Sequence, residues 1–400
     1  MIRKKIHICF LTRNYDAPEF GGRNPSLRYI SEELKKRGYV VTIISTPSRR
    51  NYLQKKFPNY VHFTRFFINY YFTVLLSPIL VYFLIRKINR KHKIDIIHSC
   101  EREFMGIAGY IFKKIHKIFL IQWVYDMGYT AQKREVLLIK KSPLKYFAVF
   151  YFKLAERFVL SKADIITTIG KDIQKDLIKR GFDKNKIFFI GNCVDTEKFK
   201  PQKPNKKLLE EFNLKNKIVI CFIGRITFYR GADIFIKSIP LICKKIKNSI
   251  FLIVGSDKDN YKKQFVSLSK KLGVADKIIW VGVRHDIPDI LNISDFVVIP
   301  PRKGAGGIGN ALLEAMSCGK AVIQSNVASA GYVIKNYKNG VLFKDGDYKA
   351  IANSIVYLYN NKKLKKEIEK NARETVLRNY TVEKIVDKLE KIYRKLLEKK

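Results

Sequence analysis

Short apolar runs recur along the whole chain, and stretches with the period of an amphipathic helix lie between them. Runs without polar alternation are typical of strands that are buried on both faces, as in parallel sheets covered by helices. The pattern therefore predicts a doubly wound α/β protein. We expect strands at Ile6–Leu11, Val40–Ile44, Ile94–His98, Ile118–Val124, Ile165–Thr168 and Ile187–Ile190, then at Ile218–Ile223, Phe251–Val254, Lys277–Trp280, Phe296–Ile299 and Ala321–Gln324.

A chain of 400 residues is long enough for two domains. The segment Thr196–Lys207 has two prolines, several lysines and one apolar side chain, which is typical of an exposed linker. We therefore expect a first domain over residues 1–198 and a second over residues 199–375. The last part of the chain, residues 376–400, is expected to form a separate amphipathic helix. Its apolar face would consist of Ile385, Leu389, Ile392 and Leu396.

The segment 66–85 is apolar and carries no formal charge, and basic residues flank it on both sides. Its length suits a membrane span, but Pro78 lies within it and a predicted strand follows it. Three interpretations are open: a span, a buried pair of helices, or a hairpin that dips into one leaflet. In the hairpin, aromatic side chains would lie at the interface and lysines on lipid phosphates, and this is the arrangement that we expect.

The formal net charge of +43 is spread along the chain. Such an excess attracts polyanions, so an anionic membrane surface is an expected partner. No nucleic-acid-binding motif accompanies the charge, and we expect no nucleic-acid partner. The six cysteines occur singly, which indicates a reducing compartment. Because the first apolar run is too short for a secretion signal, we expect a cytoplasmic protein that is peripheral on the inner face of the membrane.

Two glycine-containing stretches in the second half each join a predicted strand to a predicted helix. In Gly224–Gly231, Arg225 and Arg230 can close on one pyrophosphate and neutralise the charge that develops on it. The second stretch, Pro300–Asn310, leads into a helix that contains Glu314, a design that suits phosphate and sugar. A carboxylate at Glu314 can bind a ribose diol. The alternatives are a solvated basic loop and a structural carboxylate.

Candidate groups are fewer in the first half. The glycine pair that ends at Gly22 follows the first strand, where the backbone can approach an anion. Asp126 can orient an acceptor hydroxyl or simply form a turn or helix cap. His98 can face a substrate or be a hydrogen-bonded core residue. The sequence Asp257-Lys258-Asp259 spells a metal-binding motif of another fold, but its place before a helix favours a cap, so we expect no metal.

These motifs resemble those of glycosyltransferase family four, the large retaining group with the GT-B fold. The similar residues are Gly307-Ile308-Gly309, Leu313-Glu314-Ala315-Met316, Gly319, Val322-Ile323, Asp164-Ile165-Ile166-Thr167 and Gly191-Asn192-Cys193-Val194-Asp195. The likeness covers nearly the whole chain. It implies two Rossmann-like domains that face each other across a cleft, with a C-terminal helix that crosses back to the first domain. The donor would be a nucleotide-sugar such as a UDP- or GDP-sugar, with no other cofactor.

The resemblance also implies a role for each matching residue. Arg225 and Arg230 would hold the donor diphosphate, and Glu314 would bind the ribose. The acceptor would be a glycan or a lipid-linked precursor of surface polysaccharide. The remaining donor-site residues would be Gly22 near the phosphate, Val283 at the base, and Gly306, Gly307, Ile308, Gly309 and Asn310 at the sugar.

Two departures from the family pattern concern the reacting centre. Gly306 stands where relatives have the first glutamate of a pair, and Tyr125-Asp126 stand where many relatives have a histidine. Two further interpretations therefore stay open beside a retaining transferase. One is a nucleotide-sugar epimerase of the same fold, and the other is a nucleotide-binding subunit without activity.

Overall fold

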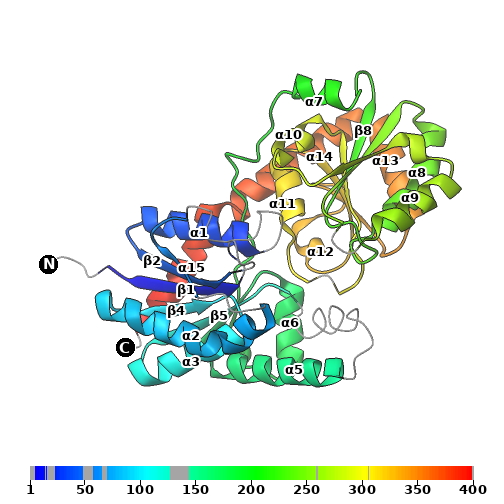
Figure 1. The fold of residues 1–400 in the computed structure, drawn as a ribbon. Coiled ribbons are helices and arrows are strands. Elements are labelled where there is room, and N and C mark those ends of the chain that lie inside the picture. The colour runs from blue at the N-terminus through cyan, green and yellow to red at the C-terminus, as the bar shows by residue number, and fades with distance from the viewer. Residues whose placement is uncertain are drawn as a thin grey trace. The chain divides into compact units, whose positions relative to one another are not determined.

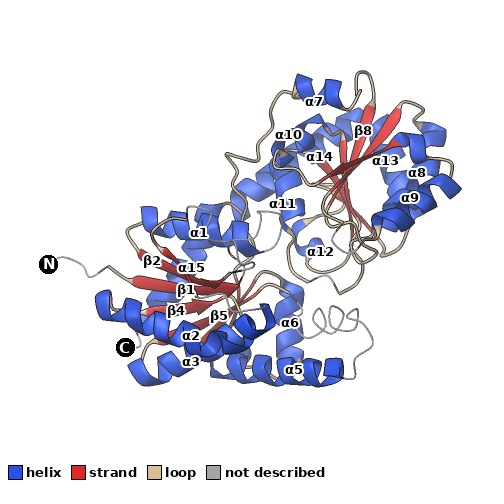
Figure 2. Ribbon diagram, viewed as in Figure 1, coloured by secondary structure: helices blue, strands red, loops and turns tan. Residues whose placement is uncertain are grey.

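The computed structural model describes residues 5–13, 15, 23–47, 57–64, 70–126, 144–257, 260–304 and 306–398. The chain forms two compact units (Figure 1). The described residues up to Gly191, together with those from Ile385 onward, make up the first unit, and those from Asn192 to Lys384 make up the second. Each unit contains a parallel sheet with helices packed around it (Figure 2). The predicted doubly wound α/β fold is confirmed.

The described sheet of the first unit has the strand order β3-β2-β1-β4-β5-β6-β7. Its strands are β1 (His7–Arg13), β2 (Val40–Thr46), β3 (Val61–Phe63), β4 (Ile96–Ser99), β5 (Phe119–Val124), β6 (Ile165–Thr168) and β7 (Ile187–Phe189). Its helices are α1 (Arg23–Lys36), α2 (Tyr70–Lys91), α3 (Phe104–His116), α5 (Leu144–Lys162), α6 (Lys171–Lys179) and α15 (Val382–Leu397). Because parallel connections are right-handed, α1 covers one face, and α2, α3 and α5 cover the other (Figure 1).

The uncharged segment 66–85 does not form a hairpin or a pair of helices in its described part. From Tyr70 onward it is one continuous helix, α2, which accommodates Pro78 in its interior. Val81 and Ile85 are buried in the core that α2 shares with α3 and the sheet, so packing on one side keeps the helix in place. No helix in the described part of the chain is long and apolar enough to cross a membrane.

The C-terminal helix α15 is part of the first unit from Ile385 onward. The predicted apolar face of this helix is confirmed, because Ile385, Leu389, Ile392 and Leu396 are all buried. Tyr393 is also fully buried, and its hydroxyl bonds to Nδ1 of His98 on β4 at 2.8 Å. Arg37, directly after α1, forms ion pairs with two acids of α15, both at 2.7 Å: Asp387 and Glu390.

The described sheet of the second unit has the order β10-β9-β8-β11-β12-β13. Its strands are β8 (Ile218–Ile223), β9 (Ser249–Val254), β10 (Ile278–Gly282), β11 (Phe296–Ile299), β12 (Ala321–Ser325) and β13 (Val341–Phe343). Its helices are α7 (Lys206–Glu211), α8 (Ala232–Lys245), α9 (Lys262–Lys271), α10 (Ile287–Ile293), α11 (Asn310–Ser317), α12 (Ala330–Val333), α13 (Tyr348–Asn360) and α14 (Lys362–Asn379). The strand order reverses between β8 and β11, and open α/β sheets bind ligands at the carboxyl ends of strands at such a point.

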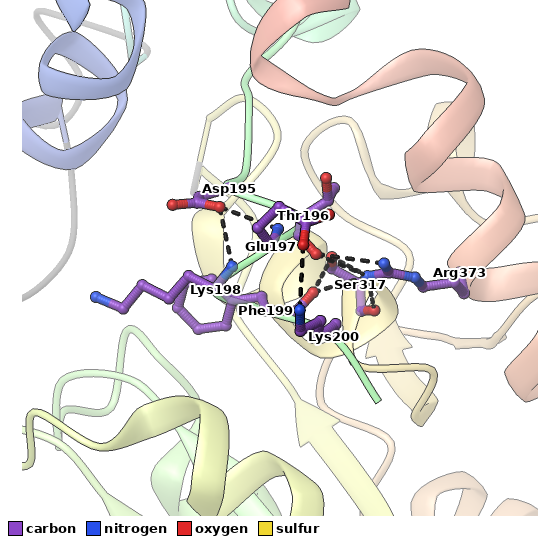
Figure 3. A network of polar contacts seen from close by, with 8 residues as sticks. All are labelled: Asp195, Thr196, Glu197, Lys198, Phe199, Lys200, Ser317 and Arg373. Atoms are coloured by element: carbon purple, nitrogen blue, oxygen red, sulfur yellow. Dashed lines mark hydrogen bonds and ion pairs between the residues drawn. The ribbon is translucent and has the colours of Figure 1, made fainter. Parts of the chain in front are cut away.

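The segment predicted as an exposed linker begins instead as a packed part of the second unit. The chain enters that unit at Asn192, earlier than the predicted boundary at residue 198. Figure 3 shows the Arg373 guanidinium of α14 directed at carbonyl oxygens of this segment. It donates to the carbonyls of Thr196 at 3.3 Å, Phe199 at 2.8 Å and Ser317 at 2.6 Å. The lysine-rich composition hid these backbone contacts, which hold the segment against α11.

Candidate functional site

Three glycines stand at the carboxyl ends of neighbouring strands in the second unit. Gly224, Gly255 and Gly282 follow β8 and β9 and end β10, and all have positive φ. A Cβ on Gly255 would lie only 1.8 Å from the carbonyl oxygen of Gly224, so no other residue fits without a shift of the backbone. The amide of Gly255 also donates to the carbonyl of Gly282 at 2.8 Å. The three loops are therefore closely packed and present their backbone at this edge.

The loop that carries both candidate arginines packs against the segment that follows β11. Gly231 ends this loop in the left-handed region, with φ of 75°, and an added Cβ would lie 1.8 Å from the carbonyl oxygen of Pro300. The amide of Arg302 donates to the carbonyl of Tyr229 at 3.0 Å. Because β8 and β11 are adjacent, the arginine loop and the glycine-rich stretch meet at the point where the strand order reverses.

Arg225 and Arg230 form no ion pair with any acid in the described part of the chain. Arg225 is exposed and Arg230 is half-buried. Burial and the nearby charge of Arg225 lower the pKa of Arg230, but an arginine remains charged at neutral pH. Arg302, in the adjacent segment, is by contrast paired with Asp233 at 2.7 Å. Two neighbouring cations without acidic partners favour the binding of an anion with more than one charge.

The glycine-rich stretch leads directly into the N-terminus of α11. Gly307 has φ of 74°, and Gly309 precedes the helix without a side-chain cap. Asn192 braces the stretch from a position far away in the sequence: its Nδ2 donates to the carbonyl of Ile308 at 3.1 Å and to the Asn310 side chain. Sequence reasoning placed Asn192 in a family motif but gave it no role. No spacing signal links residues so far apart.

Glu314 lies on α11 and is half-buried. Burial raises the pKa of its carboxyl group to about 7, and the positive charge of Lys198 acts in the opposite direction. No hydrogen bond or ion pair joins this carboxylate to another residue of the described chain. A buried carboxyl without a partner is costly, so hydroxyl groups of a ligand would stabilise its ionised form. Lys198 is a second residue near this group that sequence reasoning missed.

The other predicted donor-site residues lie at the same sheet edge where they are described. Val283 follows β10 and is 46% exposed. Gly306 lies in the stretch before α11, next to the buried Gly307. Gly22 lies outside the described residues.

His98 is a core residue, the second of the two interpretations that the sequence left open. Its ring is fully buried within β4, stacked on Phe10 at 5.1 Å between ring centroids. Nδ1 bonds to Tyr393, and Nε2 lies 3.4 Å from Oγ1 of Thr167. Burial lowers the pKa of His98 to about 3, so the ring is neutral at physiological pH. The expectation that His98 faces a substrate is therefore wrong, because the core surrounds the imidazole.

Asp126 lies just after β5, and Arg102 holds it in place. The guanidinium of Arg102 donates to the Asp126 carboxylate at 2.5 Å and to its backbone carbonyl at 3.1 Å. Arg102 is itself buried, whereas the Asp126 side chain is 49% exposed. The carboxylate is thus oriented by a fixed cation and still reaches solvent.

Asp257, the first residue of the possible metal motif, accepts a hydrogen bond from the amide of Lys262 at 3.1 Å. Lys262 is the first residue of α9, so Asp257 satisfies the first amide of this helix, although the residue at the N-cap position is Tyr261 and not a member of the motif. Lys258 and Asp259 lie outside the described residues. Among the residues that are described, no three His, Cys, Asp or Glu side chains form a group that could hold a metal ion.

Two family models match adjacent parts of the chain. Residues 20–198 match the model described as Glycosyltransferase Family 4, and residues 204–375 match the model of Glycosyl transferases group 1. An uncharacterised glycosyltransferase of Methanocaldococcus jannaschii is 29% identical over 76% of both chains. An α-1,3-galactosyltransferase of Escherichia coli, which uses UDP-Gal and GlcNAc-diphosphoundecaprenol, is 28% identical over 77% of both chains.

Solved structures show the same fold. A glycosyltransferase from Rickettsia africae superimposes with a TM-score of 0.78 and 21% identity over 99% of this chain and 100% of its own. Anabaena HepE with UDP-glucose gives a TM-score of 0.76 at 19% identity, over 98% and 100% of the two chains. Together with the two family models, these likenesses confirm the resemblance seen in the motifs. The chain belongs to the family-four glycosyltransferases with the GT-B fold.

Proposed function

We propose that this enzyme transfers a sugar from a nucleotide-sugar donor to a glycan or lipid-linked acceptor, with retention of the anomeric configuration. The observation that carries the proposal is the pair Arg225 and Arg230, two neighbouring cations that have no acidic partner among the residues that the structure describes. They lie where the strand order of the second sheet reverses, beside a glycine-rich stretch and the helix that holds Glu314. The arginines can bind a diphosphate, the glycine-rich stretch can bind a sugar, and Glu314 can bind a ribose, and these are the three parts that a nucleotide-sugar donor presents.

In the proposed mechanism, the donor diphosphate lies between the two arginines and the ribose diol donates to Glu314. The backbone of Gly307–Asn310 contacts the donor sugar. As the bond between the anomeric carbon and the phosphate oxygen breaks, negative charge grows on the diphosphate, and the arginines stabilise it. The acceptor oxygen attacks the anomeric carbon on the face from which the phosphate departs. The departing phosphate oxygen takes the acceptor proton.

The two arginines supply the positive charge that a divalent metal supplies in other transferases, so we propose that the reaction requires neither metal nor cofactor. Asp126 stays the predicted group that orients an acceptor hydroxyl. Its exposed carboxylate, fixed by Arg102, supports that role. HepE, with its bound UDP-glucose, supports a UDP-sugar as the first donor to test, and a GDP-sugar as the second.

The named acceptors of relatives support a lipid-linked precursor of surface polysaccharide. The relative in Escherichia coli acts on a sugar joined to diphosphoundecaprenol, and one in Staphylococcus aureus, 29% identical over 65% of this chain, serves capsular polysaccharide biosynthesis. We infer that this enzyme meets its acceptor at the cytoplasmic face of the membrane. The net charge of +43 favours an anionic surface.

The function is tested in two steps. The melting temperature of the protein is measured in the presence of UDP- and GDP-sugars, and sugar transfer is then assayed. A bound donor raises the melting temperature by mass action. The donors that do so are mixed with a synthetic sugar-diphosphate lipid, with and without a chelator, and NMR gives the configuration of the product. Transfer that inverts the anomeric centre, or that stops with the chelator, contradicts the mechanism. Conversion of the donor without any acceptor would identify an epimerase.

A further inference from the structure

Three neighbouring helices of the first unit present large apolar side chains to solvent. The helices α2, α3 and α5 lie side by side on one face of the sheet (Figure 1). Their exposed apolar residues are Ile79 and Phe83 on α2, Ile111 and Ile115 on α3, and Phe150, Tyr151, Leu154 and Phe158 on α5. Scattered exposed apolar residues are ordinary, but a contiguous set marks an interaction surface. We call this set the α2/α3/α5 face.

Ring contacts join the three helices that carry the exposed side chains, through a buried ring between α2 and α3 and through the exposed Phe158 between α3 and α5. Tyr82 of α2 contacts both the exposed Phe83 at 5.7 Å and Phe112 of α3 at 6.0 Å between ring centroids. Tyr110 of α3 meets the exposed Phe158 of α5 edge-on at 5.1 Å. On each helix exposed apolar residues recur four positions apart, as in a single stripe, and Tyr151 on α5 lies beside that stripe.

The same helices carry many cations and no exposed acid in their described part. Neither α2 nor α3 contains an acidic residue. The single acid of α5, Glu156, is fully buried and paired with Arg180 at 2.9 Å. The exposed cations are Arg86, Lys87, Arg90 and Lys91 on α2, Lys114 on α3, and Lys153, Arg157 and Lys162 on α5.

We propose that the α2/α3/α5 face docks on a bilayer with anionic headgroups. The apolar side chains reach the boundary of the acyl chains, and the cations meet lipid phosphates. Charge complementarity singles out this occupant, because a face that combines apolar stripes with many cations, on helices whose described parts expose no acid, matches the interface of an anionic membrane. The proposal rests on the proposed function only in placing the enzyme at a membrane. It replaces the expected hairpin with the sides of three folded helices.

The test measures binding of the full-length protein to sedimented vesicles of phosphatidylglycerol or phosphatidylcholine. The apolar variant combines Phe83→Ser, Ile115→Ser, Phe150→Ser and Leu154→Ser, all at positions at least half exposed. The charge variant combines Lys87→Gln, Arg90→Gln, Lys114→Gln and Arg157→Gln. We expect the wild type to bind phosphatidylglycerol in a salt-sensitive manner, and each variant to lose about tenfold or more in partitioning.

Matched controls come from the second unit. Lys362→Gln, Lys363→Gln, Lys366→Gln and Lys370→Gln on α14 remove the same charge, and Tyr357→Ser with Leu377→Ser remove exposed apolar side chains. These controls should bind vesicles like the wild type. Equal losses in controls and face variants, or no loss in either face variant, would show that the face does not dock on membranes. If the protein does not bind vesicles but forms a dimer that the apolar variant disrupts, the face is a self-association surface instead.

A second measurement does not depend on a loss of binding. Leu154→Trp places an indole on the face, and lipids brominated in their acyl chains should quench its fluorescence, whereas Tyr357→Trp should not be quenched. Absence of quenching at residue 154 contradicts docking of this face. Donor binding, measured without vesicles, should be unchanged in every face variant. A protein that docks but fails to bind any nucleotide-sugar would refute the proposed function and leave the docking surface intact.

Discussion

Arg225 and Arg230 differ from the other arginines near the site, because no acid in the described residues pairs with either of them. Arg302 is held by Asp233, and Arg284 by Asp286 and Glu211. A paired arginine already has its charge compensated and gains less from a ligand. Unpaired neighbouring cations repel each other, and a diphosphate between them removes that repulsion.

Replacement of either arginine should therefore slow the chemical step more than it weakens donor binding. We expect Arg225→Ala and Arg230→Ala each to cost about 2–4 kcal/mol of transition-state stabilisation, or about 30- to 1,000-fold in kcat. The double variant should cost less than the sum, since both side chains act on one anion. Arg230→Lys should keep much of the activity. Measured kcat and donor Kd check this, with the exposed Arg378→Ala as control. Near-normal kcat in both alanine variants would place the diphosphate elsewhere.

Glu314 should make stability depend on pH. Its folded pKa of about 7 lies above the ordinary value of 4.5, so between these values the folded state holds more protons than the unfolded state. The resulting stabilisation is full below about pH 4.5 and is lost as the pH rises through about 7. Melting curves of the free enzyme from about pH 5 to 8 should show this loss, and Glu314→Gln should remove it. Identical curves for both proteins would mean that Glu314 ionises normally. Saturating donor should reduce the loss, because ribose hydroxyls stabilise the carboxylate.

Strands were the elements that the sequence predicted best, because burial on both faces leaves a continuous apolar run. Ile165–Thr168, Ile218–Ile223 and Phe296–Ile299 coincide with β6, β8 and β11. The strands β3 and β13 were missed, because neither lies in an apolar run as long as Ile187–Ile190, which predicted the equally short edge strand β7. The site was predictable where local spacing carries it, as in the arginine loop. The bracing by Asn192 was not, because its contacts join positions more than a hundred residues apart.

The helix α15 contributes one polar contact to the core whose removal can be measured. Tyr393→Phe deletes the hydroxyl that bonds to His98 and leaves Nδ1 of a buried imidazole without a partner. We expect a loss of about 1–3 kcal/mol in the free energy of unfolding of the first unit. Denaturant titration followed by hydrogen exchange in β4 checks this loss. Tyr357→Phe, at a half-exposed tyrosine, should leave stability unchanged. A neutral Tyr393→Phe would show that the two side chains are not bonded in solution.

At the scale of the whole molecule, the residues of the proposed sites are distributed unequally between the two units. The second unit holds every described residue of the proposed donor site, from Arg225 to Glu314. The first unit holds Asp126 and the α2/α3/α5 face. The sequence predicted two domains but placed the boundary at residue 198. The prediction relied on where polar residues and prolines accumulate, and composition does not show which backbone carbonyls accept hydrogen bonds from a distant side chain. Arg373 supplies those donors to Thr196 and Phe199.

Removal of residues 382–400 should affect the two units differently. The first unit loses six buried side chains of α15, among them Tyr393 and Leu396, whereas the second unit keeps its sheet and its arginine loop. We expect hydrogen exchange of the truncated protein to show protected amides in β8–β12 and fast exchange in β1–β6. Retained protection in both sheets would contradict this expectation. A thermal shift with UDP alone should still report binding.

The return of α15 to the first unit also has a consequence for synthesis on the ribosome. Domains usually fold in the order in which they emerge, the N-terminal one first. Here the N-terminal sheet emerges first but lacks its last core helix until α15 has left the exit tunnel. The second unit has all of its strands long before that moment. The second unit should therefore finish folding while the first unit still lacks α15 and exposes the surface of β4. We expect the need for chaperones to be greatest in this period.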